Sequence, residues 1–384
     1  MKAISILPLA ASLAVAACSA DVTAGDDDGG SGSGSQDEFD QILASRTTDY
    51  FAALRIAALR LTGDLPALID VDAIANAPDY ASRRAAYEQV ITHYLASAAF
   101  ARQMFLFWRD TFKIGGTAAL DTAPALAAEL TVTNASYMDL FTRATGNCPT
   151  VDATRTQFTD AECGNGGAQA GVLTNPGVLS VYYSNLAFRR VRWVQETFAC
   201  ARFPAEVTAM PEEVGGAAPY LGAWPFGSLA SPRNGGGRID FQDVSSAVCG
   251  DCHATLNHQA PLFAGYDAQG VLQPSIAVAV PVEGAPPAAL ADWLPPGEAT
   301  AWRFGKPAAD LPALGAAMAA DPDVAWCGVA RIWNWALGKP DIVDAHQVVP
   351  ATVIQGQIDR FIASGFKIKD LIFAVFTSDD FVRF

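Results

Sequence analysis

The residues with the most specific spacing are two thiols and an imidazole in the segment Cys249-Gly250-Asp251-Cys252-His253. Two cysteines three positions apart, followed at once by a histidine, form the covalent attachment pattern of a c-type haem. The spacing has a chemical reason, because thiols on one short turn can add to both haem vinyl groups as thioethers. The next imidazole is then held beneath the iron and can ligate it. We therefore expect one covalent haem c, attached through Cys249 and Cys252, with His253 as the proximal iron ligand.

Three other interpretations of the two thiols compete with haem. Half of a zinc site would need a second pair of clustered ligands, and no other residues are spaced that way. A redox-active CxxC usually lies in a βαβ pattern, which is missing here. A short structural disulfide is the third. The adjacent histidine and the signs of export described below favour haem.

The second axial ligand decides what the iron can do. A methionine there raises the potential for electron transfer, whereas an open position permits small-molecule chemistry. His258 is too close in sequence to reach the opposite face of the macrocycle. Met210 and His346, in loops before and after the motif, are the weak candidates, and His93 and Met318 are distant enough as well. Each is more often a non-ligand than a ligand, so the second ligand stays open.

The first residues resemble a bacterial lipoprotein signal. Lys2 precedes an apolar run at 4–17 that is too short to span a bilayer comfortably, and small residues lead directly into Cys18. The resemblance implies that residues 1–17 are removed and that Cys18 carries acyl chains, which together give stable anchoring. An ordinary secretory signal with an incidental cysteine is the alternative. We expect an exported protein of the cell envelope, anchored by lipid at the outer membrane or cell surface rather than the inner membrane.

Composition divides the rest of the chain. Residues 18–36 are mainly Asp, Gly and Ser, and such a tract cannot bury enough surface to fold, which predicts a flexible tether. Apolar stripes at helical spacing predict a mainly α fold with long Pro- and Gly-rich loops and no large sheet. We expect an N-terminal helical domain at 37–203, an irregular haem-bearing segment at 204–306 and a C-terminal helical domain at 307–384.

Several individual elements can be placed from these stripes and from the glycines that end them. Helices are predicted at 39–61, 82–95, 100–112, 124–130, 187–200, 311–320, 324–337, 353–362 and 368–375. A small hairpin could form at 276–282.

The charge balance restricts the partners. The chain has 25 basic and 40 acidic residues, a net charge of −15. This argues against nucleic acid and against adsorption on anionic lipid, so contact with the membrane is expected through the lipid anchor only. The charge suits a basic redox partner protein, although solubility alone explains it equally well.

The remaining cysteines fit an oxidising compartment. Of seven, Cys18 is assigned to lipid and two to haem, which leaves Cys148, Cys163, Cys200 and Cys327. Four thiols allow two disulfides in three connectivities. Cys148 and Cys163 flank one polar, Gly-rich loop, so we pair them, and Cys200 is left with Cys327. Buried free thiols are the alternative.

Two further groups of residues could touch a haem. An arginine cluster at 189, 190 and 192 could steer a propionate or an acidic partner, but such a cluster is more often a salt-bridged helix face. Apolar residues after the motif would suit either a porphyrin face or an ordinary core; they are Leu256, Ala260, Pro261, Leu262, Phe263 and Tyr266.

Several short segments are familiar in combination. They are 58–66, 95–100, 107–110, 170–174, 189–200, 249–270, 321–322, Cys327, 331–333, 337–338 and 377–381. Together they resemble the cytochrome-c-like surface lipoproteins of planctomycetes and myxobacteria, which consist of domains of unknown function around one CxxCH motif. The resemblance implies a haem-containing exported protein. Members of that set often have a methionine three residues after the haem histidine, where this chain has Leu256, so any role of that methionine is missing here.

These observations support three hypotheses of different classes. The first is a lipid-anchored monohaem c-type cytochrome that carries electrons between redox partners and transforms no substrate. The second is an envelope binding or scaffold lipoprotein in which haem has a structural role. The third is a redox enzyme such as a peroxidase, ranked last because the di-haem bacterial type needs two attachment motifs and this chain has one.

Overall fold

The computed structural model describes residues 41–42, 44–202, 247–280, 286–294, 297–303, 306–343 and 349–384, and leaves out the side chains of 247–252 and 254. Residues Thr47–Phe384 form one compact unit. The fold is mainly α, as predicted, and in the described residues the strands form only two short antiparallel pairs. No helix in the described ranges is long and apolar enough to cross a membrane.

The first helices are defined by their capping residues. They are α2 (Tyr50–Leu61), α3 (Leu68–Ala75), α4 (Tyr80–Leu95), α5 (Ala98–Phe112) and α6 (Thr122–Val132). Asp49, Asp79 and Ser97 each accept hydrogen bonds from backbone N–H groups in the first turn of α2, α4 and α5, which satisfies donors that a helix start leaves without partners. The predicted helix at 39–61 is interrupted: residues 41, 42, 44 and 45 are helical, but the chain leaves the helix before Asp49, an extended capping residue after which α2 begins.

The middle of the chain holds the first disulfide and the helices that surround the motif. A short α7 (Asp139–Thr142) is followed by β1 (Thr150–Val151) and β2 (Phe158–Thr159), which pair in the loop closed by Cys148 and Cys163. The helical elements that follow are η1 (Gly171–Thr174), α8 (Pro176–Val181), η2 (Asn185–Ala187), α9 (Phe188–Phe198) and α10 (Ala247–Phe263). Helix α10 falls within the segment expected to be irregular. Gly250 and Pro261 weaken its local propensity, and its burial against α9 and β3 stabilises it instead.

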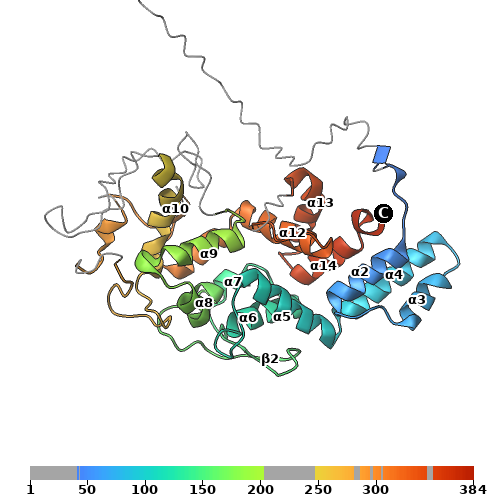
Figure 1. Cartoon of the computed structure of the whole chain (residues 1–384), viewed down its shortest axis with the longest axis horizontal. Coiled ribbons are helices and arrows are strands. Elements are labelled where there is room, and N and C mark those ends of the chain that lie inside the picture. Colours follow the sequence, from blue (N-terminus) through green and yellow to red (C-terminus); the bar gives the residue numbers. More distant parts are fainter. Residues whose placement is uncertain are drawn as a thin grey trace, which may run out of the picture. The chain divides into compact units, whose positions relative to one another are not determined.

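The C-terminal elements pack back onto the first helices. They are η4 (Leu290–Asp292), β3 (Ala301–Arg303), β4 (Lys306–Pro307), α11 (Leu311–Ala319), α12 (Pro322–Ala336), α13 (Ala351–Ala363), α14 (Ile368–Phe376) and α15 (Asp379–Val382). Helix α12 contacts α13, α14, α2 and α9, and α14 contacts α4 (Figure 1). The last residue pairs with the start of the unit, since Thr47 N–H donates to the Phe384 carbonyl and Phe384 N–H donates back.

The two expected disulfides are present. Cys148 is joined to Cys163 and Cys200 to Cys327, across 15 and 127 residues of chain. The second links the segment after α9 to the middle of α12. Helices from 37–203 and 307–384 thus share one apolar core. The expected division into three parts, with boundaries at 203/204 and 306/307, stays a prediction.

Candidate functional site

Helix α10 carries the thiol and imidazole motif. Its backbone is helical from Ala247 onward, so Cys249, Cys252 and His253 stand at positions i, i+3 and i+4. Residues at this spacing lie on one face of a helix. The side chains of the two cysteines are outside the described residues. Their backbone positions, with that of His253, lie on one face of α10.

The His253 ring is held in a partly buried setting by two neighbours. Its Nδ1 lies 3.1 Å from the Asn257 Oδ1, one helical turn along α10. The Phe188 ring, at the start of α9, meets it edge to face with centroids 5.0 Å apart. Because an amide oxygen only accepts, the hydrogen bond puts the proton on Nδ1 and the lone pair on Nε2. This is the tautomer that a metal-ligating imidazole needs.

The charge state of His253 also suits a ligand. Burial lowers the pKa of His253, and the hydrogen bond to Asn257 only partly offsets that effect. The ring is therefore neutral at pH 7, and a neutral imidazole is the form that ligates metals.

A buried arginine fixes α9 against the far end of α10. Arg190 is 1 % exposed. Its guanidinium donates two hydrogen bonds to the Leu179 carbonyl and one each to the carbonyls of Phe263, Tyr266 and Asp267, at 2.7–2.9 Å. These carbonyls include the C-terminal end of α10, which is negative because the peptide dipoles sum along the helix. Burial lowers the pKa of Arg190 to about 10, still high enough to keep it charged.

Three consecutive polar residues in the middle of α10 are buried and hydrogen-bonded. Residues 257–259 are Asn, His and Gln, and all three are at most 3 % exposed. Successive helical residues are turned by about 100°, so three buried in a row require protein around much of the helix. Each has a hydrogen-bond partner, as buried polar groups generally do. His258 Nε2 lies 3.0 Å from Glu298 Oε2, Gln259 donates to the Trp302 carbonyl at 2.6 Å, and Gln195 of α9 donates to Gln259 at 3.2 Å.

A carboxylate joins this region to α12. Asp321 precedes that helix and accepts from its Asp323 N–H, and its Oδ2 accepts from the Trp302 indole at 2.8 Å and from Lys306 at 3.2 Å. Burial raises the pKa of Asp321, but the Trp302 hydrogen bond, the Arg303 charge and the Lys306 contact outweigh it, so that pKa lies below its ordinary value.

The apolar residues after the motif lie in the protein core. Leu256, Ala260, Phe263 and Tyr266 are buried among side chains of the chain itself, and Pro261 and Leu262 are partly buried. Within the described residues these side chains therefore have the role of ordinary core.

Of the four candidates for the second axial ligand, the structure describes two. Met210 and His346 lie outside the described residues, as does Cys18. Met318 is fully buried in α11. His93 is exposed on α4.

The arginine cluster has three different roles. Arg192 forms an ion pair with Glu196 at 2.8 Å along α9, which matches the helix-face interpretation. Arg189 lies over the Tyr182 ring, 6.0 Å from its centroid. Arg190 caps backbone carbonyls, as described above, and this role was not visible from the sequence. Its neighbours in the sequence are Arg189 and Val191, so no local pattern distinguishes it from the other two arginines.

His253 and the backbone of α10 fit the proximal side of a haem. The helical spacing, the neutral imidazole and its Nδ1 hydrogen bond are the properties that a proximal ligand of this kind requires. Among the side chains that are described, no three of His, Cys, Asp or Glu gather as a metal site. Searches against models of protein families, curated proteins and solved structures found no match.

Proposed function

We propose that this chain is a monohaem c-type cytochrome of the cell envelope that carries electrons between redox partner proteins. The observation that carries the proposal is the placement of Cys249, Cys252 and His253 at i, i+3 and i+4 of one helix. Haem c, when bound, supplies one-electron chemistry between ferric and ferrous iron.

The protein's part in this function is to hold and tune the proximal side. Asn257 orients the His253 ring and keeps the proton on Nδ1. Phe188 covers one edge of that ring. The buried polar contacts of α10 and the carbonyl cap from Arg190 fix the helix that carries all three motif residues. No residue of the chain is assigned a role in transforming a substrate.

We also propose that Cys18 anchors the protein and that residues 18–36 hold the folded unit away from the membrane. The net charge of −15 would favour encounter with a basic partner. Cell fractionation tests the anchor: Cys18→Ser should move the protein out of the membrane fraction, and retention of the variant there would contradict lipid anchoring.

Redox titration of the purified, matured protein tests the electron-carrier function. We expect a reversible one-electron couple with fast exchange, because the iron would change only its oxidation state. A haem that cannot be cycled reversibly would contradict electron transfer and support the structural role. A high-spin ferric spectrum that shifts with cyanide or peroxide would instead support an enzyme with an open coordination site.

A further inference from the structure

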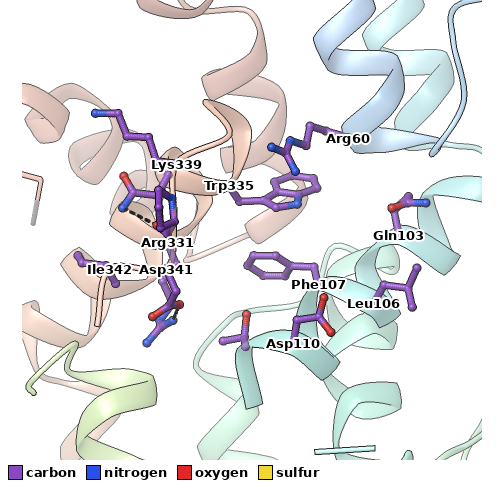
Figure 2. A pocket seen from close by; sticks show the side chains of 13 residues that line it. Arg60, Gln103, Leu106, Phe107, Asp110, Arg331, Trp335, Lys339, Asp341 and Ile342 are labelled. Atoms are coloured by element: carbon purple, nitrogen blue, oxygen red, sulfur yellow. Dashed lines mark hydrogen bonds and ion pairs between the residues drawn. The ribbon is translucent and has the colours of Figure 1, made fainter. Parts of the chain in front are cut away.

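A cavity of about 330 Å³ lies at the end of α2, between α5 and α12 (Figure 2). Its walls come from α2, α5, α12 and the segment that follows α12, and no described residue of α9 or α10 lines it. The cavity is therefore separate from the haem motif. Its size is within the range of small-molecule sites, which is roughly 300–1,000 Å³.

One wall of the cavity is aromatic. Phe107 of α5 and Trp335 of α12 have ring centroids 5.3 Å apart, and both rings are partly exposed. Leu106 and Ile342 add aliphatic surface. Figure 2 shows the two rings next to each other, one from each helix, with Arg60 beside Trp335. Ring faces of this kind favour a flat apolar partner.

The charged residues of the lining leave an excess of positive charge. Arg331 forms an ion pair with Asp341 and also donates to the Thr197 carbonyl at 3.2 Å, so this pair is internally neutral. The other acid, Asp110, contacts Arg109 at 3.3 Å.

Two cations of the lining remain. Arg60 and Lys339 take part, among the described residues, in no ion pair or side-chain hydrogen bond, although the chain as a whole has a net charge of −15. Gly338, which has a φ of +70°, permits the close approach of Arg60, because a Cβ there would lie 2.9 Å from the Arg60 Nη2. The guanidinium thus lies at the edge of the cavity.

We propose that this cavity binds a small molecule with an anionic group on a planar apolar body. The planar body would pack against Phe107 and Trp335, and Arg60 would bind the anion, because a guanidinium presents a fork of donors that matches carboxylate and phosphate oxygens. Lys339 adds a second positive charge at the exposed rim. The site is independent of haem and of electron transfer.

Calorimetric titration of the full-length protein with three matched probes tests the proposal. Benzoate and phenyl phosphate carry the anion on a phenyl ring, and benzamide is the neutral counterpart. We expect at least one anion to bind about tenfold more tightly than benzamide, as a charge-assisted hydrogen bond implies. Which anion binds more tightly then identifies the anionic group. The preference should decrease with added salt, since the cations are partly exposed.

Variants then assign the binding to this cavity. Arg60→Gln should weaken anion binding about tenfold, and Lys339→Gln should weaken it by a smaller factor, with benzamide binding unchanged in both. Arg55→Gln and Lys367→Gln remove exposed cations outside the cavity and should change nothing. Three results would overturn the proposal: no detectable binding of either anion by folded protein, equal binding of anions and benzamide, or full anion affinity in Arg60→Gln.

Discussion

His253 depends on Asn257 for its orientation. Both lie on α10, and the Nδ1 to Oδ1 distance of 3.1 Å spans one helical turn. Such a contact raises the basicity of a ligating imidazole and fixes its ring plane. A more basic ligand stabilises the ferric state, so Asn257 should lower the reduction potential.

Asn257→Leu removes this hydrogen bond and tests its effect on the reduction potential. A neutral hydrogen bond contributes about 0.5–1.5 kcal/mol. Its loss should therefore raise the potential of the one-electron couple by at most roughly 20–60 mV, since only the part that differs between ferric and ferrous iron shifts the potential. Potentiometric titration measures the shift, and Asn76→Leu, at the exposed end of α3, is the control. An unchanged or lower potential would show that Asn257 does not tune the iron.

The candidate site residues Cys249, Cys252 and His253 could be found from the sequence. The residues that contact His253 or fix α10 could not. Covalent attachment requires a particular spacing of thiols and imidazole, which leaves a local pattern. Asn257 and Phe188 contact His253 through a side-chain rotamer and through the packing of α9 on α10, and neither has a local signature. Arg190 looks like its neighbours Arg189 and Arg192, but only Arg190 is buried.

At the scale of elements, Arg190 links α8, α9 and the end of α10. It is a buried cation whose charge is balanced by carbonyl dipoles and by the negative charge of Asp267, although its hydrogen bonds go to carbonyls. Removing it would leave the Leu179 and Tyr266 carbonyls without the donor that the structure shows for them, whereas the Phe263 and Asp267 carbonyls would keep hydrogen bonds from the Tyr266 and Gly270 N–H groups. An unsatisfied buried carbonyl is costly.

Arg190→Met should therefore destabilise the folded unit by about 3–5 kcal/mol. Arg192→Met, two positions along the same helix, removes only an exposed ion pair and should cost less than about 0.5 kcal/mol. Denaturant unfolding of both variants measures the difference. Equal effects would mean that Arg190 does not fix α10.

Asp321 makes stability depend on pH at the β3–α12 junction. Its folded-state pKa is lowered, so its contribution is fully present above the unfolded-state pKa and is lost as pH falls through the lower, folded-state pKa. Asp321→Asn should destabilise the protein at pH 7 and should differ less and less from the parent below about pH 4. Unfolding at a series of pH values measures this, and a constant difference across the series would contradict it.

The sequence predicts elements best where an apolar stripe meets an end signal. The expected helices at 311–320, 324–337, 353–362 and 368–375 correspond to α11–α14 within a few residues. Helix α10 was missed because its residues 257–259 are polar yet buried, which removes the stripe. The hairpin expected at 276–282 is wrong for the described residues 276–280, which form no strand; the strands instead pair at β3 and β4, where Trp302 anchors them to Asp321.

At the scale of the whole molecule, two disulfides constrain very different lengths of chain. Cys148–Cys163 closes a local loop of 15 residues, and Cys200–Cys327 links segments 127 residues apart. The local disulfide could be predicted because its two cysteines flank one loop. The second disulfide then followed, because only Cys200 and Cys327 remained. The packing of α12 against α9 and α2 did not follow, because long-range contacts depend on side-chain shape rather than on periodicity.

Removing the long-range disulfide should cost more than removing the local one. Chain entropy predicts losses of about 5 kcal/mol for a loop of more than 100 residues and about 3 kcal/mol for one of 15. Denaturant unfolding of the Cys200→Ala/Cys327→Ala and Cys148→Ala/Cys163→Ala pairs compares them. A larger loss from the local pair would contradict this order.

Covalent haem on α10 is the central claim, and a denaturing gel tests it most directly. Protein exported and matured in a host with c-type maturation machinery is denatured, separated and assayed in the gel for haem. We expect haem to migrate with the parent chain and with Cys148→Ala/Cys163→Ala, and to be absent from Cys249→Ala/Cys252→Ala. A colourless parent chain, with sulfurs 249 and 252 joined to each other or bound to zinc, would contradict the account.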